Sequence, residues 1–119
     1  HWGWEYEPEN ERQKALARAM IDAGADIVIG GHPHVTQGVE YYRGKLIVYS
    51  LGNFLFDGFD TPESTTGWLL ELKMNKHGLV DWRTHVAHMD VQGIPHLDAA
   101  APSPRGNALE QEIVLKAGD

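Results

Sequence analysis

The spacing of apolar and polar residues predicts one helix and then a short buried strand. Alanine, leucine and methionine recur at helical spacing at Ala15, Leu16, Ala19, Met20 and Ala23. The acidic segment Pro8-Glu9-Asn10-Glu11 predicts the helix start, because negative charge is favoured at a helix N-terminus, and Gly24 predicts the helix end. Residues 26–29 end in the apolar run Ile27-Val28-Ile29, which is typical of a strand buried in an α/β sheet.

Two hairpins are predicted after this strand. Residues 37–42 and 46–50 flank the turn sequence Arg43-Gly44-Lys45, and residues 68–74 and 79–88 flank Asn75-Lys76-His77-Gly78. The polar residues 57–67 between the hairpins predict a loop. The pattern therefore predicts a mixed α/β domain over residues 1–95. Prolines at 95, 102 and 104 predict that residues 96–119 form a linker and then a short helical tail over 107–116.

Composition narrows the class of protein. The chain has 119 residues, 42% of them hydrophobic, which suits one small globular domain. A net charge of −7 argues against a nucleic-acid partner, since phosphate backbones are bound by clustered Lys and Arg. The chain opens on His1 without an initiator Met, so we interpret it as a piece of a longer protein. It has no membrane-spanning apolar run and no signal-peptide pattern, but a piece cannot exclude either, so localisation stays open.

The motif Gly30-Gly31-His32-Pro33-His34 is the strongest candidate for chemistry. It follows the apolar strand at its carboxyl end, where open α/β sheets place ligand sites. Pro33 is expected to hold His32 in an extended conformation, and in extended backbone His32 and His34 would project to the same side. Because the chain has no cysteine, a metal here would be bound by imidazole, carboxylate or amide oxygen.

Four sequence motifs resemble one family in order and spacing. They are His1-Trp2-Gly3-Trp4-Glu5-Tyr6 with Gln13, Ala23-Gly24-Ala25-Asp26, Gly31-His32-Pro33-His34-Val35 with Gln37-Gly38, and Tyr49-Ser50-Leu51-Gly52-Asn53-Phe54. This half of the chain resembles the CapA-type bacterial capsule synthesis proteins, the poly-γ-glutamate capsule group of the calcineurin-like metallophosphoesterases. Residues 1–95 would then be the C-terminal portion of such a domain.

The resemblance implies part of a layered α/β/β/α sandwich with two divalent metal ions, Mn, Fe or Zn, at the strand ends. His1 and His32 match ligands of one metal, and His34 matches a ligand of the other. The family's upstream Asp and Asn-His motifs are not in this sequence, so the missing N-terminal half of the domain is an expected partner. These residues alone are therefore expected to hold one metal at most, and no catalytic residue is assigned.

Glu5 and Asn53 are candidates for residues that contact the metal ligands or the substrate without binding the metal themselves. A carboxylate at Glu5 could orient a ligand histidine or a water, and the Asn53 amide could lie beside the site. For both residues, a helix-capping or turn role is the preferred alternative. The other histidines, His77, His85, His88 and His96, are expected to be solvated or structural, and the four tryptophans are expected to pack in the core and at its rim.

Three functions remain open at this stage. The first is a metal-dependent hydrolase of phosphate esters, or of a related bond in a cell-surface polymer, in which paired cations activate a water. The second is a non-catalytic component of polyglutamate capsule synthesis or export, and the third is an inactive scaffold fragment. An upstream Asp and Asn-His pair would favour the first, and an upstream membrane anchor would favour a role at the bacterial surface.

Overall fold

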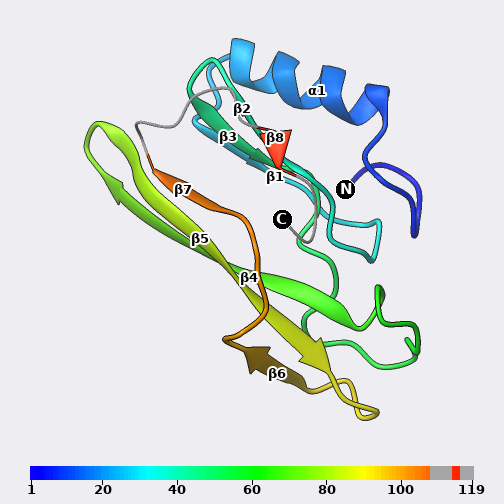
Figure 1. The fold of residues 1–119 in the computed structure, drawn as a ribbon. Helices are drawn as coiled ribbons and strands as arrows, with labels where there is room; N and C mark the ends of the chain where they lie inside the picture. The colour runs from blue at the N-terminus through cyan, green and yellow to red at the C-terminus, as the bar shows by residue number, and fades with distance from the viewer. Residues whose placement is uncertain (108–113, 116–119) are drawn as a thin grey trace.

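A helix, a four-stranded sheet and a second sheet follow one another in space in the computed structural model, which describes residues 1–107 and 114–115 (Figure 1). The elements in chain order are α1 (Glu11–Asp22), β1 (Ile27–Ile29), β2 (Val39–Tyr42), β3 (Lys45–Val48), β4 (Thr66–Asn75), β5 (Gly78–Met89), β6 (Pro95–Asp98), β7 (Arg105–Asn107) and β8 (Val114–Leu115). The predicted helix, first strand and both hairpins are all present.

Helix α1 begins with a capping box at Asn10. The Asn10 side chain accepts a hydrogen bond from the Gln13 amide (3.0 Å), and the Gln13 side chain accepts one from the Asn10 amide (3.1 Å). The helix buries Gln13, Ala17 and Ile21, which follow one another at four-residue spacing. Leu16 and Met20, part of the predicted apolar pattern, are exposed instead. The described helix is too short and too polar to cross a membrane.

The first sheet has the strand order β1-β3-β2-β8. Strand β1 runs parallel to β3, while β2 pairs antiparallel with β3 through a tight turn at Arg43-Gly44, both residues having positive φ (50° and 73°). Among the described strands, β1 lies at the sheet edge. Its central Val28 is buried but Ile29 is 48% exposed, so the prediction of a buried strand holds only for its middle.

The second sheet corrects the prediction of a linker and helical tail. Strands β4 and β5 form the long predicted hairpin, and β6 and β7 then pair in succession along the edge of β5 that β4 leaves free. Residues 96–98 and 105–107 are therefore strand, because backbone pairing with β5 outweighs the local effect of the prolines. Residues 114–115 pair with β2 as strand β8, and the rest of the predicted helical tail lies outside the described residues.

Two apolar clusters hold three layers together. Between α1 and the first sheet lie Ala17, Ile21, Val28, Ile47 and Tyr49. Between the two sheets lie Val39, Tyr41, Leu46, Val48, Trp68, Trp82 and Val86. The layers are thus helix, sheet and sheet, which agrees with the predicted α/β sandwich. A second helix layer is not found among the described residues.

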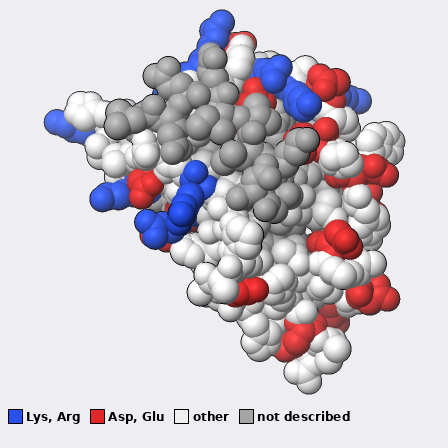
Figure 2. Space-filling model, in the orientation of Figure 1, with Lys and Arg blue, Asp and Glu red and all other residues white. Residues whose placement is uncertain are grey.

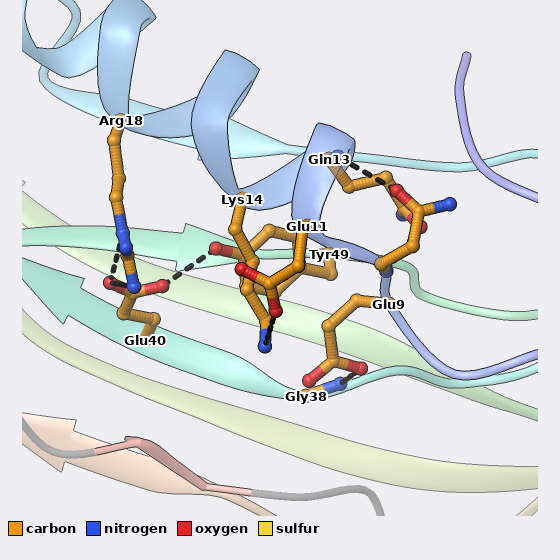
Figure 3. Close-up of polar contacts among 9 residues, drawn as sticks. Glu9, Glu11, Gln13, Lys14, Arg18, Gly38, Glu40 and Tyr49 are labelled. Carbon is orange, nitrogen blue, oxygen red and sulfur yellow. Dashed lines mark hydrogen bonds and ion pairs between the residues drawn. The ribbon is translucent and has the colours of Figure 1, made fainter.

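A polar network crosses the interface between α1 and the first sheet (Figure 3). The Glu40 side chain is 5% exposed and is contacted by the Arg18 guanidinium (2.8 Å) and by the Tyr49 hydroxyl (2.6 Å). Glu40 therefore has both partners that a buried carboxylate requires. Burial and the hydrogen bond to Glu40 raise the pKa of Tyr49, and the Glu40 hydrogen bond raises the pKa of Arg18.

Candidate functional site

The loop that carries His32 and His34 continues directly from the end of β1. The Gly30 amide donates to the Val48 carbonyl (2.8 Å), so this loop begins as an extension of the sheet. Residues 32–34 then leave the extended conformation: His32 has φ 107° and His34 has φ 61°. The prediction of an extended His-Pro-His segment is therefore wrong, because contacts beyond the segment override the local preference before proline.

This loop stores backbone strain. Of the four described non-glycine residues with positive φ, His32 and His34 lie in this loop, and Tyr6 lies in the N-terminal segment, where its amide donates to the Pro33 carbonyl. The fourth is in the β2–β3 turn. Each such conformation costs about 1–3 kcal/mol and persists only where the surrounding structure enforces it. The surrounding structure therefore holds both histidines in backbone conformations that they do not favour by themselves.

The N-terminal segment lies along the same loop. The Trp2 amide donates to the Gly31 carbonyl (3.2 Å), the Tyr6 amide donates to the Pro33 carbonyl (2.8 Å), and the Trp2 indole donates to the Tyr49 carbonyl (2.7 Å). These bonds place residues 1–6 beside residues 31–34. Two segments that are about thirty residues apart in the chain thus meet at one site.

The structure brings the predicted histidines together and adds Glu5 to them. The His1 and His32 ring centroids are 4.0 Å apart, and those of His32 and His34 are 5.9 Å apart. Glu5, His32 and His34 each offer one ligand atom within 4.8 Å of the others. Among the described residues this is the one group with that geometry. Glu5 therefore lies where it could bind a metal directly, rather than only orienting a ligand, and His1 packs against the group without joining it.

Asn53 orients His34. The His34 Nδ1 atom lies 2.8 Å from Asn53 Oδ1, and Asn53 Nδ2 donates to the carbonyl oxygens of His34 (3.2 Å) and Ser64 (2.8 Å). Because the amide nitrogen faces two carbonyl acceptors, the amide oxygen must face the ring, and His34 Nδ1 must carry the proton. The lone pair of the neutral ring is then on Nε2, which is the state that a metal requires.

Two groups of residues around the site were missed by the sequence analysis. Gln13 Nε2 donates to Gln37 Oε1 (2.8 Å), and Gln37 Nε2 donates to the Glu7 carbonyl (2.9 Å), which ties the N-terminal segment to the helix and sheet. Both glutamines are at most 2% exposed. Phe56 and Phe59 place their rings 5.7 and 5.0 Å from that of His34. The glutamines lie in the motifs that carry the family resemblance, but nothing local gives them a role.

The remaining histidines lie on the second sheet and pair with carboxylates. His85 contacts Glu71 (2.7 Å), His88 contacts Asp98 (3.2 Å) and His96 contacts Asp90 (2.8 Å). These surface pairs agree with the structural role expected for them. Of the tryptophans, Trp68 and Trp82 are buried in the core, whereas Trp4 is 74% exposed beside Glu5 and does not pack as expected.

Comparisons with known proteins place the chain in a family. Residues 1–58 match the family described as bacterial capsule synthesis protein PGA_cap. The chain is 41% identical over 119 residues to the PGA biosynthesis protein CapA of Bacillus subtilis and 38% identical over 118 residues to the capsule biosynthesis protein CapA of Bacillus anthracis. Each alignment covers 98% of the chain but only 29% and 26% of those relatives. A probable polyglutamine synthesis accessory protein of Mycobacterium tuberculosis is 41% identical over 59 residues, which are 48% of the chain and 15% of that protein.

The matched region contains the whole candidate site. His1, Glu5, His32, His34 and Asn53 all lie within residues 1–58, and the second sheet follows that region. The family match over residues 1–58, together with 41% and 38% identity to the two Bacillus proteins over nearly the whole of this chain, shows that the chain belongs to the bacterial capsule synthesis protein family.

Proposed function

We propose that the protein acts in the synthesis of a poly-γ-glutamate capsule, as a metal-dependent hydrolase of phosphate esters. The capsule role is supported by two relatives, a PGA biosynthesis protein and a capsule biosynthesis protein. The observation that carries the chemical part is the group of Glu5, His32 and His34, whose ligand atoms lie within 4.8 Å of one another.

This ligand set fits a divalent transition metal. Two neutral imidazoles and one carboxylate suit Zn, Mn or Fe, and the asparagine behind His34 is the kind of outer contact that selects the ligand tautomer. When bound, such a cation polarises a phosphoryl oxygen and lowers the pKa of a bound water toward neutrality. Glu5, His32 and His34 would hold it, and Asn53 keeps the proton of His34 on Nδ1.

Metal content and turnover test the proposal together. The protein in its full natural length is stripped with a chelator, reloaded with Mn²⁺ or Zn²⁺, and assayed for bound metal and for hydrolysis of bis(p-nitrophenyl) phosphate. We expect His34→Ala and Glu5→Gln to lower both quantities, because each removes a ligand. His85→Ala and Glu71→Gln, which break a surface pair on the second sheet, should leave both unchanged.

A different result would point to another role. If His34→Ala leaves metal content and turnover at the level of the unchanged protein but impairs capsule assembly in cells, the hydrolase proposal is wrong. The protein would then act as a non-catalytic component of capsule synthesis or export.

A further inference from the structure

A cleft of about 990 Å³ lies beside the candidate metal site. One wall is the loop over residues 58–64, and the floor includes Trp68 and Val86 from the second sheet. Tyr6 and Pro8 form part of the opposite wall. This volume is at the upper end of the range of small-molecule sites.

The cleft adjoins the candidate metal site through two aromatic side chains. Tyr6 and Phe59 line it, and their rings lie 6.5 and 5.0 Å from the ring of His34. Its loop wall is fixed from behind, because the Ser64 carbonyl accepts the Asn53 hydrogen bond and the Pro62 carbonyl accepts one from the Thr66 hydroxyl (2.7 Å). A substrate with its reacting group at His34 would therefore extend its remaining part into a preformed cleft.

The charge around the cleft is negative and uncompensated. Glu7, Asp60 and Glu63 line it, and no Lys or Arg is among the described residues that do so. Elsewhere in the described chain, each Asp and Glu outside residues 5–9 and 57–63 contacts a Lys, Arg or His. These paired carboxylates are Glu11, Asp22, Asp26, Glu40, Glu71, Asp81, Asp90 and Asp98.

The carboxylates that form no ion pair thus belong to two chain segments, residues 5–9 and 57–63, and three of them line the cleft. Within the described residues, Glu5, Glu7, Glu9, Asp57, Asp60 and Glu63 form no ion pair. The sequence explains the segregation, since no Lys or Arg occurs in residues 1–11, 46–72 or 84–104. Figure 2 shows this separation of charge on one face of the molecule: the Lys and Arg side chains lie in its upper part, and its lower part shows acidic but no basic side chains. A negative cleft repels polyanions and concentrates cations.

We propose that this cleft binds a positively charged organic group of the substrate, an amine or quaternary ammonium on an apolar body. Three carboxylates supply the charge, and the accessible aromatic rings of Tyr6 and Phe59 supply surfaces that attract cations. The substrate class is then a phosphate ester with a cationic organic part, an assignment that rests on the proposed function for its phosphate half. The polyglutamate chain itself, a polyanion, is not the group held here.

Three small probes of one shape and different charge test the cleft directly. Benzylamine, benzyl alcohol and benzoate are titrated into the metal-free, ¹⁵N-labelled protein, and binding is followed at the Trp68 indole and the Gly58 amide. We expect benzylamine to bind about tenfold more tightly than benzoate, since unit charges interact over these distances even in a partly solvated site. Because no metal is present, failure of the hydrolase proposal leaves this measurement unaffected.

Matched variants separate the cleft from general surface charge. The triple variant Glu7→Gln, Asp60→Asn, Glu63→Gln removes the three exposed carboxylates that line the cleft and should abolish the preference for benzylamine. Glu71→Gln, an exposed carboxylate on the second sheet, removes one charge away from the cleft and should leave the preference intact. Equal binding of benzoate and benzylamine by the unchanged protein, or a preference that survives the triple variant, would overturn the proposal.

Discussion

Asn53 both stabilises the fold and orients a candidate metal ligand, so its replacement tests the stability of the protein and its metal affinity. The side chain is 5% exposed and makes three hydrogen bonds, one with His34 Nδ1 and two with carbonyl oxygens. At roughly 1 kcal/mol for each net hydrogen bond, Asn53→Ala should lower the free energy of unfolding by about 3 kcal/mol. Loss of the contact that sets a ligand tautomer should also weaken metal binding by about 10–100-fold.

Asn53→Asp separates these two effects. Its carboxylate still accepts the hydrogen bond from His34 Nδ1, so the ring keeps its tautomer and metal affinity should fall less than in Asn53→Ala. The fold should be destabilised at least as much, because a buried charged oxygen then faces the carbonyls of His34 and Ser64. Asn75→Ala is the matched control, since the Asn75 side chain accepts a hydrogen bond from the His77 amide in an exposed turn.

Three measurements report the outcome of this series. Urea unfolding followed by tryptophan fluorescence gives the stability, calorimetric titration with Mn²⁺ gives the metal affinity, and ¹⁵N chemical shifts of the imidazole give the His34 tautomer. The reasoning is refuted if Asn53→Ala leaves His34 protonated on Nδ1 and the Mn²⁺ affinity unchanged. Asn53 would then be a loop anchor only.

Two further predictions concern the packing behind the site. Burial and Glu40 raise the pKa of Tyr49 above its ordinary 10.0, so the unfolded chain loses this proton at lower pH than the native state does. The stabilisation that this raised pKa contributes is present below pH 10 and is lost above it by about 1.4 kcal/mol per pH unit. In urea unfolding between about pH 9 and pH 11, the free energy of unfolding should therefore fall less steeply with pH for Tyr49→Phe than for the unchanged protein. An identical fall would contradict the assignment. Gly30→Ala should lower the free energy of unfolding by about 1–3 kcal/mol, because a Cβ there would clash with the Trp2 indole and the Tyr49 carbonyl. Gly31→Ala is the control, since a Cβ at Gly31 meets no atom within 4 Å and should change the melting temperature little. Equal melting temperatures of the two variants would count against the close approach at Gly30.

Local sequence patterns were sufficient to predict the elements that residues close together in the chain stabilise. The helix follows from its capping residues, and both hairpins follow from their turn sequences between alternating strands. Strands β6 and β7 could not be predicted in this way. Their residues look like a proline-rich linker, and they are strand only because β5 offers an unpaired edge, which is a property of the assembled sheet.

Some features of the candidate site likewise follow from the sequence, and others depend on the tertiary structure. The sequence by itself determined which residue types could bind a metal, since without cysteine only imidazole, carboxylate and amide oxygens remain, and it placed His32 and His34 after a buried strand. The tertiary structure alone decided that Glu5 joins them, that His34 is protonated on Nδ1, and that the loop is left-handed instead of extended. These features depend on hydrogen bonds between residues far apart in the chain, such as Tyr6 with Pro33, and no periodicity within a short segment records such contacts.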